Sequence, residues 1–412
     1  MEFILKNAQL KEIDKEIFAL NKEYGMALES LNKLPNIYAA KEIIKNIDKL
    51  RKKIVKLNLD DEFDILYVKN SLYNFEAQEA YLEYFTTAEK EDIDGLMKKE
   101  LGDDIIDVLK RNCQSFDYKA FWEYYLSYQE YTYRKIPSDD EAIRETLKKI
   151  LADLKKDTVN YAAEFFNFPK DYQFDLILGQ PYSRGAYFHP TNRRMEVSPE
   201  KFFVFKNGEK IKINNCIAIS VLFHELVGHG RHEINSRNLP LALQNNSINV
   251  ALSPTHIHAE GVSQICKDDA IDFMKKYKDK YNIEDDFIKQ EYLSKISESA
   301  MSFWVYYQYL QMKKLENDDF NVEEEFKKVS NNHGMYLLYS TLKESPISCI
   351  RNANYVAGLE YMNNLLDDLK KEFGEEYFEK NRALINQAIS YGLWHFKVLP
   401  DFVRLFLKRH KK

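Results

Sequence analysis

The chain has 412 residues, of which 59 are basic and 65 are acidic, so its formal net charge is −6. Hydrophobic residues make up 45% and charged residues 30%, which is typical of a globular protein and excludes wholesale disorder. The mild acidity argues against a general nucleic-acid-binding protein, because such proteins are normally basic.

Nothing in the sequence indicates a membrane span, a secretory leader or a disulfide framework. The longest apolar run, Cys216–Phe223, is far shorter than the roughly 20 residues that cross a bilayer. The first residues are charged from position 2 and lack the apolar core of a signal peptide. No CxxC pair occurs among the four cysteines, which are Cys113, Cys216, Cys266 and Cys349. We therefore expect a soluble, cytoplasmic protein that binds neither membrane nor nucleic acid.

Residues 1–168 have the pattern of successive amphipathic helices. Leu10, Ile13, Ile17 and Leu20 recur at helical spacing, and a second apolar stripe runs from Ile43 to Leu57. Twelve of the 23 glycines and prolines lie between Pro169 and Gly261, which indicates an irregular middle. We predict a helical N-terminal region, 1–168, and a catalytic region, 169–412, that can form one compact unit with it.

The middle of the chain predicts a small β element. Residues 174–178 are a short strand candidate, and residues 202–213 read as a hairpin whose Asn207-Gly208 pair suits a type I′ turn. The apolar run Cys216–Phe223 predicts a buried helix, and the chain from 262 onward is again helical. The expected fold is mainly α: a multi-helix protein with a small sheet or hairpin before the active-site helix.

Five of the nine histidines lie between residues 224 and 258, and the central motif is His224-Glu225-x-x-x-His229. The familiar zinc-peptidase motif spaces its two histidines by four residues, on one face of an α-helix. A spacing of five would point the two rings apart on a regular helix. We therefore expect either a π-bulge or a helix that unwinds at Gly228.

A catalytic zinc needs a third protein ligand and an open fourth position. The segment 255–261 offers His256, His258 and Glu260, and we favour Glu260. Glu225 lies next to the first histidine, so it can take a proton from water at the open position and deliver it to the leaving amine. A closed structural zinc site, or a helical interaction scaffold with such a site, is the competing interpretation.

At these residues the sequence resembles the gluzincin metallopeptidases, in which two histidines of one helix and a glutamate of a later helix bind zinc. The wider spacing is similar to that of dipeptidyl-peptidase III. The HExxxH motif followed by Ala259-Glu260-Gly261 resembles the tyrosine-carboxypeptidase-like family more closely, and bacterial proteins with an EGWA motif are a related comparison. The resemblance covers residues 180–360 at most.

Further site residues follow from this resemblance. Asn354-Tyr355-x-x-Gly358 resembles a late Tyr-x-x-Gly element of these families, so Tyr355 is a candidate donor to the oxyanion. Arg351, one helical turn earlier, is a candidate for binding a substrate carboxylate. His256 and His258 are further oxyanion or supporting candidates. Four other arginines compete with Arg351 for its role: Arg184, Arg193, Arg194 and Arg231.

The sequence thus predicts a zinc metallopeptidase with Zn²⁺ held by His224, His229 and Glu260, and with Glu225 as general base and acid. The resemblance favours a carboxypeptidase acting on the C-terminus of a peptide or protein. An aminopeptidase or oligopeptidase with the same metal chemistry is the main alternative.

Overall fold

The fold is taken from a computed structural model of the 412-residue chain. It describes residues 3–28, 37–86, 92–129, 141–179, 186–189, 192–204, 212–213, 215–244, 254–285, 288, 300–330, 332–340 and 349–410.

Seven helices form the described N-terminal part of the chain. The second helix shows why the sequence folds in this way: its apolar stripe of Ile43, Ile47, Leu50 and Ile54 is buried, and its charged residues lie on the other face. The helices are α1 (Ala8–Leu28), α2 (Ile37–Ile54), α3 (Glu62–Thr86), α4 (Ile93–Leu101), α5 (Ile105–Gln114), α6 (Tyr118–Gln129) and α7 (Glu141–Phe165).

A small mixed sheet follows, with strand order β1-β3-β2. Strand β1 (Asp175–Leu178) pairs in parallel with β3 (Arg194–Val197), and β2 (Ala186–His189) pairs antiparallel with β3. After the short 3-10 helix η1 (Pro199–Phe202), β4 (Phe203–Val204) pairs antiparallel with β5 (Lys212–Ile213). The predicted strand at 174–178 and the pairing of the predicted hairpin are confirmed. The Asn207-Gly208 turn lies outside the described residues.

The predicted buried helix is the start of a continuous helical segment. It runs as α8 (Cys216–Leu222), the π-helix η2 (Phe223–Gly230) and α9 (Arg231–Ser236). The short 3-10 helix η3 (Leu241–Leu243) and the long α10 (Pro254–Lys276) come next. Strand β2 contacts η2, and α10 lies against both η2 and α15 (Cys349–Phe373).

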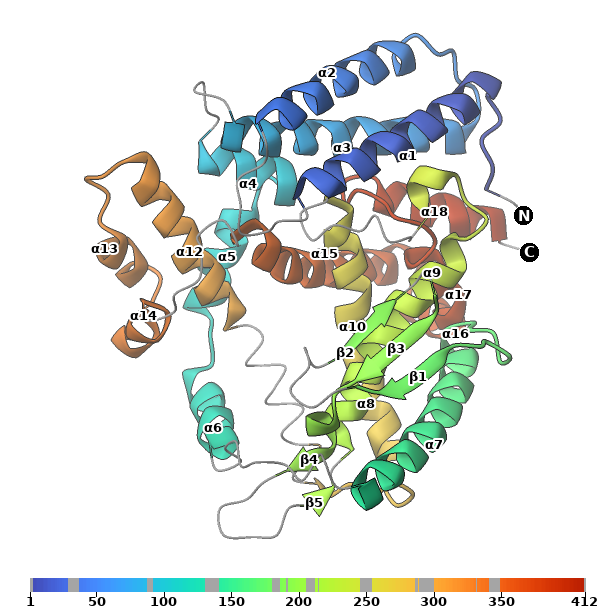
Figure 1. Cartoon of the computed structure of the whole chain (residues 1–412), viewed down its shortest axis with the longest axis vertical. Helices are drawn as coiled ribbons and strands as arrows, with labels where there is room; N and C mark the ends of the chain where they lie inside the picture. The colour runs from blue at the N-terminus through green and yellow to red at the C-terminus, as the bar shows by residue number, and fades with distance from the viewer. Residues whose placement is uncertain are drawn as a thin grey trace.

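The rest of the chain is helical, as predicted, so the described fold is mainly α with a small sheet before the site helix. In Figure 1, α10 and α15 lie in the middle of the molecule, with α1–α4 above them and the sheet and α7 below. The remaining helices are α12 (Met301–Glu316), α13 (Val322–Lys327), α14 (His333–Ser340), α16 (Glu375–Lys380), α17 (Arg382–Ile389) and α18 (Leu399–His410).

Two hydrophobic clusters hold these elements together. The first joins buried residues of 3–121 to buried residues of 239–262 and 300–407. The second contains buried residues of 147–227 and 266–288, and it includes the sheet, α8 and the C-terminal part of α10. The N-terminal helices therefore share a core with the C-terminal helices. The predicted division at residue 168 does not coincide with either cluster, because α7 packs with the sheet.

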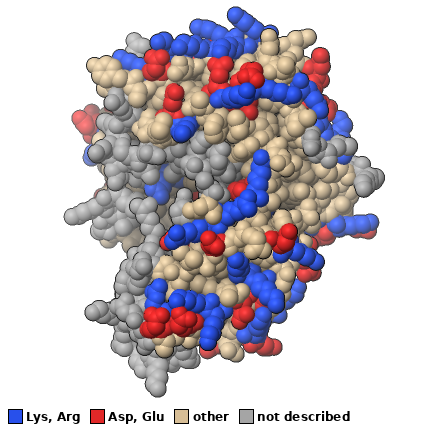
Figure 2. Space-filling view, turned by 45° about the vertical axis from the view of Figure 1, so that its right-hand side comes forward, with Lys and Arg blue, Asp and Glu red and all other residues tan. Residues whose placement is uncertain are grey.

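On the face shown in Figure 2, basic and acidic side chains are intermixed rather than gathered by sign. None of the described helices is both long and apolar enough to cross a membrane.

Candidate metal centre

The two motif histidines lie on the π-helix η2. Hydrogen bonds in a π-helix join residues five apart, so residues at that spacing lie on the same side. His224 and His229 accordingly approach each other, with ring centroids 5.1 Å apart and planes at 84°. The predicted π-bulge is confirmed, and the alternative of an unwound helix at Gly228 is wrong.

Glu260 of α10 places its carboxylate between these rings. Its Oε2 lies 3.5 Å from His224 Nε2, and its Oε1 lies 3.6 Å from His229 Nε2. One ligand atom of each residue lies within 4.8 Å of the others. Ligand atoms about 2.0–2.2 Å from a tetrahedral zinc lie about 3.3–3.6 Å from one another. Two imidazoles and a carboxylate at this separation fit a zinc ion.

Two close helix contacts bring these residues together. A Cβ on Gly228 would lie 2.6 Å from Ser263 Cα, so η2 and α10 approach more closely there than any side chain would allow. Gly261 lies in the same way against Gly358 of α15, where an added Cβ would lie 2.5 Å from the carbonyl oxygen. The glycines beside both motifs therefore permit close packing, and Gly228 does not adopt an unusual backbone conformation.

Glu225 is anchored from the sheet. The backbone N–H of Phe188 on β2 donates a hydrogen bond of 2.9 Å to Glu225 Oε2. Burial raises the pKa of Glu225 to about 7, and the hydrogen bond opposes this shift. A carboxyl group with a pKa near neutrality is suited to both taking up and giving back a proton.

Burial also sets the charge of the three candidate ligands. It raises the pKa of Glu260 to about 8, with the charge of Glu225 adding to the effect, and lowers the pKa of His229 to about 4. The pKa of His224 is also lowered by burial, and by the charge of His229. The imidazoles are thus neutral, which is the form that binds metal, and a cation between the donors would favour the ionised form of Glu260.

Three further predicted residues surround Glu260. His256 Nε2 lies 3.4 Å from Glu260 Oε1, while the ring of Tyr355 on α15 stands edge-on to His256 with centroids 6.3 Å apart. Arg351, on the first turn of α15, is exposed, and its charge lowers the pKa of Glu260. His256, Tyr355 and Arg351 therefore belong to the same site.

His258 does not belong to it. Its Nδ1 accepts the backbone N–H of Trp394 at 3.0 Å, and its Nε2 lies 2.7 Å from the carbonyl oxygen of Ile389. His232 stacks edge-on against it and binds the carbonyl oxygen of Gly392 at 2.6 Å. Both nitrogens of His258 are occupied by backbone, so the prediction that it helps to stabilise an oxyanion is wrong.

Among the competing arginines, Arg231 is buried rather than available to substrate. Its guanidinium lies over the ring of Phe166 and contacts Cys266 Sγ at 3.8 Å. Arg193 and Arg194 lie at the start of β3, and Arg184 is outside the described residues. Arg351 is the arginine whose charge acts on Glu260 and His256.

Sequence reasoning missed two contributors to the site. The backbone N–H of Phe188 carries no side-chain signature, so only the fold reveals its bond to Glu225. Lys267 lies two helical turns after Glu260, and its charge lowers the pKa of both Glu260 and His224. That i, i+7 spacing on a predicted helix is the signal that would have found it.

No protein-family model and no curated protein matches this chain.

Proposed function

We propose that the chain is a zinc-dependent metallopeptidase of the gluzincin type that hydrolyses peptide bonds. The observation that carries the proposal is the meeting of His224, His229 and Glu260 at zinc-ligand separations, with Glu225 next to the first histidine. When bound there, Zn²⁺ supplies a Lewis acid that polarises a peptide carbonyl and activates water.

The chain's own side chains would divide the remaining work. Glu225 takes up a proton and returns it to the leaving amine, since the Phe188 N–H fixes its carboxylate beside the metal ligands. Tyr355 donates its hydroxyl hydrogen to the developing oxyanion. Burial raises the pKa of Tyr355, with the charge of Glu260 adding to the effect, so the hydroxyl keeps its proton at neutral pH.

The position of β2 supports a peptide substrate. In the described sheet β2 is at the edge, and the Phe188 N–H points away from β3. Because backbone groups alternate along an antiparallel strand, those of Ala186 point the same way. Because Glu225 already accepts the Phe188 N–H, an extended peptide would pair with the outward backbone groups of Ala186, and this would place its backbone beside Glu225.

The position of Arg351 supports a carboxypeptidase. It is exposed one helical turn from Tyr355, and its charge acts on Glu260, His256 and Tyr355. A guanidinium there can bind a terminal carboxylate through two hydrogen bonds, which an internal peptide bond cannot provide. We therefore propose the C-terminus of a peptide or protein as the substrate.

The test compares Glu225→Gln with the wild type for zinc content and for cleavage of a peptide library read by mass spectrometry. Glu164→Gln, at an exposed side chain of α7, is the matched control. We expect Glu225→Gln to keep its zinc and to lose cleavage by about 10²–10⁴-fold, while the control keeps both.

The products decide the class. Loss of single C-terminal residues supports the carboxypeptidase, and internal or N-terminal cuts identify the alternative peptidases. Zinc binding with no cleavage by the wild type would favour a scaffold with a structural metal and reject the enzyme.

A further inference from the structure

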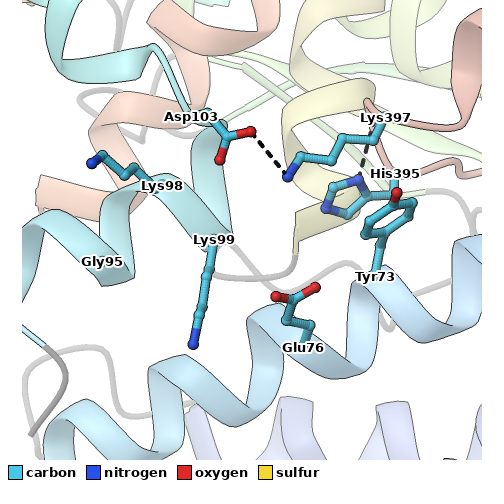
Figure 3. A pocket seen from close by; sticks show the side chains of 8 residues that line it. All are labelled: Tyr73, Glu76, Gly95, Lys98, Lys99, Asp103, His395 and Lys397. Carbon is cyan, nitrogen blue, oxygen red and sulfur yellow. Dashed lines mark hydrogen bonds and ion pairs between the residues drawn. The ribbon is translucent and has the colours of Figure 1, made fainter.

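A second site candidate lies away from the metal centre, in a cavity of about 250 Å³ formed by α3, α4 and the segment before α18. Pockets for drug-sized ligands enclose about 300–1,000 Å³, so this cavity suits a smaller molecule. Its charged walls carry both signs (Figure 3): Lys98, Lys99 and Lys397 against Glu76 and Asp103.

The centre of the cavity wall is a fixed histidine. The ring of His395 packs against the rings of Tyr73, with centroids 5.1 Å apart, and of Phe396, at 4.2 Å. Its backbone N–H donates to Asn70 Oδ1 at 2.6 Å. Only 1% of His395 is exposed, so its ring is held in place before any ligand arrives.

His395 offers one hydrogen-bond donor to the cavity. Its Nδ1 accepts the backbone N–H of Lys397 at 3.2 Å, which leaves the proton of the neutral ring on Nε2. Burial lowers the pKa of His395 to about 3, so the ring stays neutral near pH 7. Nε2 has no hydrogen-bond partner among the described residues, and it points into the cavity (Figure 3).

A cation and an acid complete the pattern. The ammonium of Lys397 lies beside His395, and the carboxylate of Glu76 lies across from them (Figure 3). Lys397 pairs with Asp103 at 3.6 Å, but the Asp103 side chain is 82% exposed. Such a pair contributes little to stability, so a ligand can displace it.

The mixed charge selects the chemical class of the ligand. A dianion such as phosphate would meet Glu76 and Asp103 as well as the lysines, and would be repelled by both carboxylates. A small zwitterion satisfies both signs at once. We propose that this cavity binds a free α-amino acid, with its carboxylate at Lys397 and His395 and its ammonium group at Glu76.

The test measures binding of free L-amino acids, one at a time, by isothermal titration calorimetry. The tightest binder is then compared with its N-acetyl derivative, which lacks the ammonium group, and its amide, which lacks the carboxylate. Lys397→Gln and Glu76→Gln each remove one partner. Lys380→Gln and Glu379→Gln, both exposed on α16, are the matched controls.

We expect saturable binding to the wild type, weakened about tenfold by each cavity substitution, because each removes one charge-assisted hydrogen bond. Neither control should change it, and both derivatives should bind more weakly than the amino acid.

Three outcomes would overturn the proposal. One is that no amino acid binds. Another is that Glu76→Gln strengthens binding, which would indicate a site for anions. The third is loss of binding in a His224→Ala, His229→Ala double variant, which would place the ligand at the metal centre. Because binding is read in that variant as well, the cavity proposal stands or falls separately from the peptidase proposal.

Discussion

Gly261 of α10 lies against Gly358 of α15 so closely that a Cβ on Gly261 would be 2.5 Å from the Gly358 carbonyl oxygen and 2.8 Å from Met362 Cγ. This contact sets the distance between the helix that carries Glu260 and the helix that carries Tyr355. The spacing of the site therefore depends on a residue without a side chain.

Gly261→Ala should force α10 and α15 apart. We expect a loss of about 1–3 kcal/mol in the free energy of unfolding, as for other overpacked cores, together with weaker zinc binding because Glu260 is the preceding residue. Denaturant unfolding and zinc titration measure the two effects. Gly230→Ala is the control, since a Cβ there meets nothing closer than 3.4 Å. Equal stability of Gly261→Ala and the wild type would refute this account of the contact.

His256 should act through Glu260 rather than as a ligand. Its Nε2 lies 3.4 Å from Glu260 Oε1, and it is not part of the three-residue group that could hold a metal. His256→Gln should keep one zinc per chain but weaken its binding by about 10–100-fold, as expected when a residue that orients a ligand is changed. Competition with a chelator measures this. Complete loss of zinc would instead make His256 a ligand.

Tyr355→Phe should affect the chemical step. Removing one oxyanion donor lowers kcat by about 10²–10³-fold, while KM should change little, because the donor acts on charge that develops in the transition state. Steady-state kinetics separates the two constants. A large rise in KM at constant kcat would assign Tyr355 to substrate binding instead.

Glu100 makes the stability of the fold depend on pH. Burial raises its pKa well above the ordinary value of 4.5, and its Oε1 has no hydrogen-bond partner. The folded chain therefore binds a proton that the unfolded chain has lost, and stability falls as pH rises above about 4.5.

Glu100→Gln removes this dependence. At pH 8 the variant should be more stable than the wild type by about 1–3 kcal/mol, because the folded wild type must keep this carboxyl protonated above its ordinary pKa and the amide has no proton to bind. The difference should shrink as the pH falls toward 4.5. Urea unfolding across this range checks it, and a constant difference at every pH would contradict the explanation.

The sequence predicted the helical fold because the apolar stripes of helices such as α2 repeat at helical spacing. It also predicted a distortion at the histidine motif, either a π-bulge or a helix unwound at Gly228, because histidines five apart do not share a face of a regular α-helix. It could not separate His256 from His258, since both are polar residues on one helix. Only the backbone groups of Trp394 and Ile389, more than 130 residues away in the chain, distinguish them. The hydrogen bond from the Phe188 N–H to Glu225 could not be predicted either, because it joins a backbone group to a side chain 37 residues away in the sequence.

Zinc content is the most direct test of the central claim, that His224, His229 and Glu260 together hold one metal ion. The measurement is inductively coupled plasma mass spectrometry of the purified wild type and of His224→Ala, His229→Ala and Glu260→Ala, with His410→Ala as control. We predict one zinc per chain in the wild type and the control, and none in the other three. Full zinc occupancy in any of those three variants, or none in the wild type, would contradict the account.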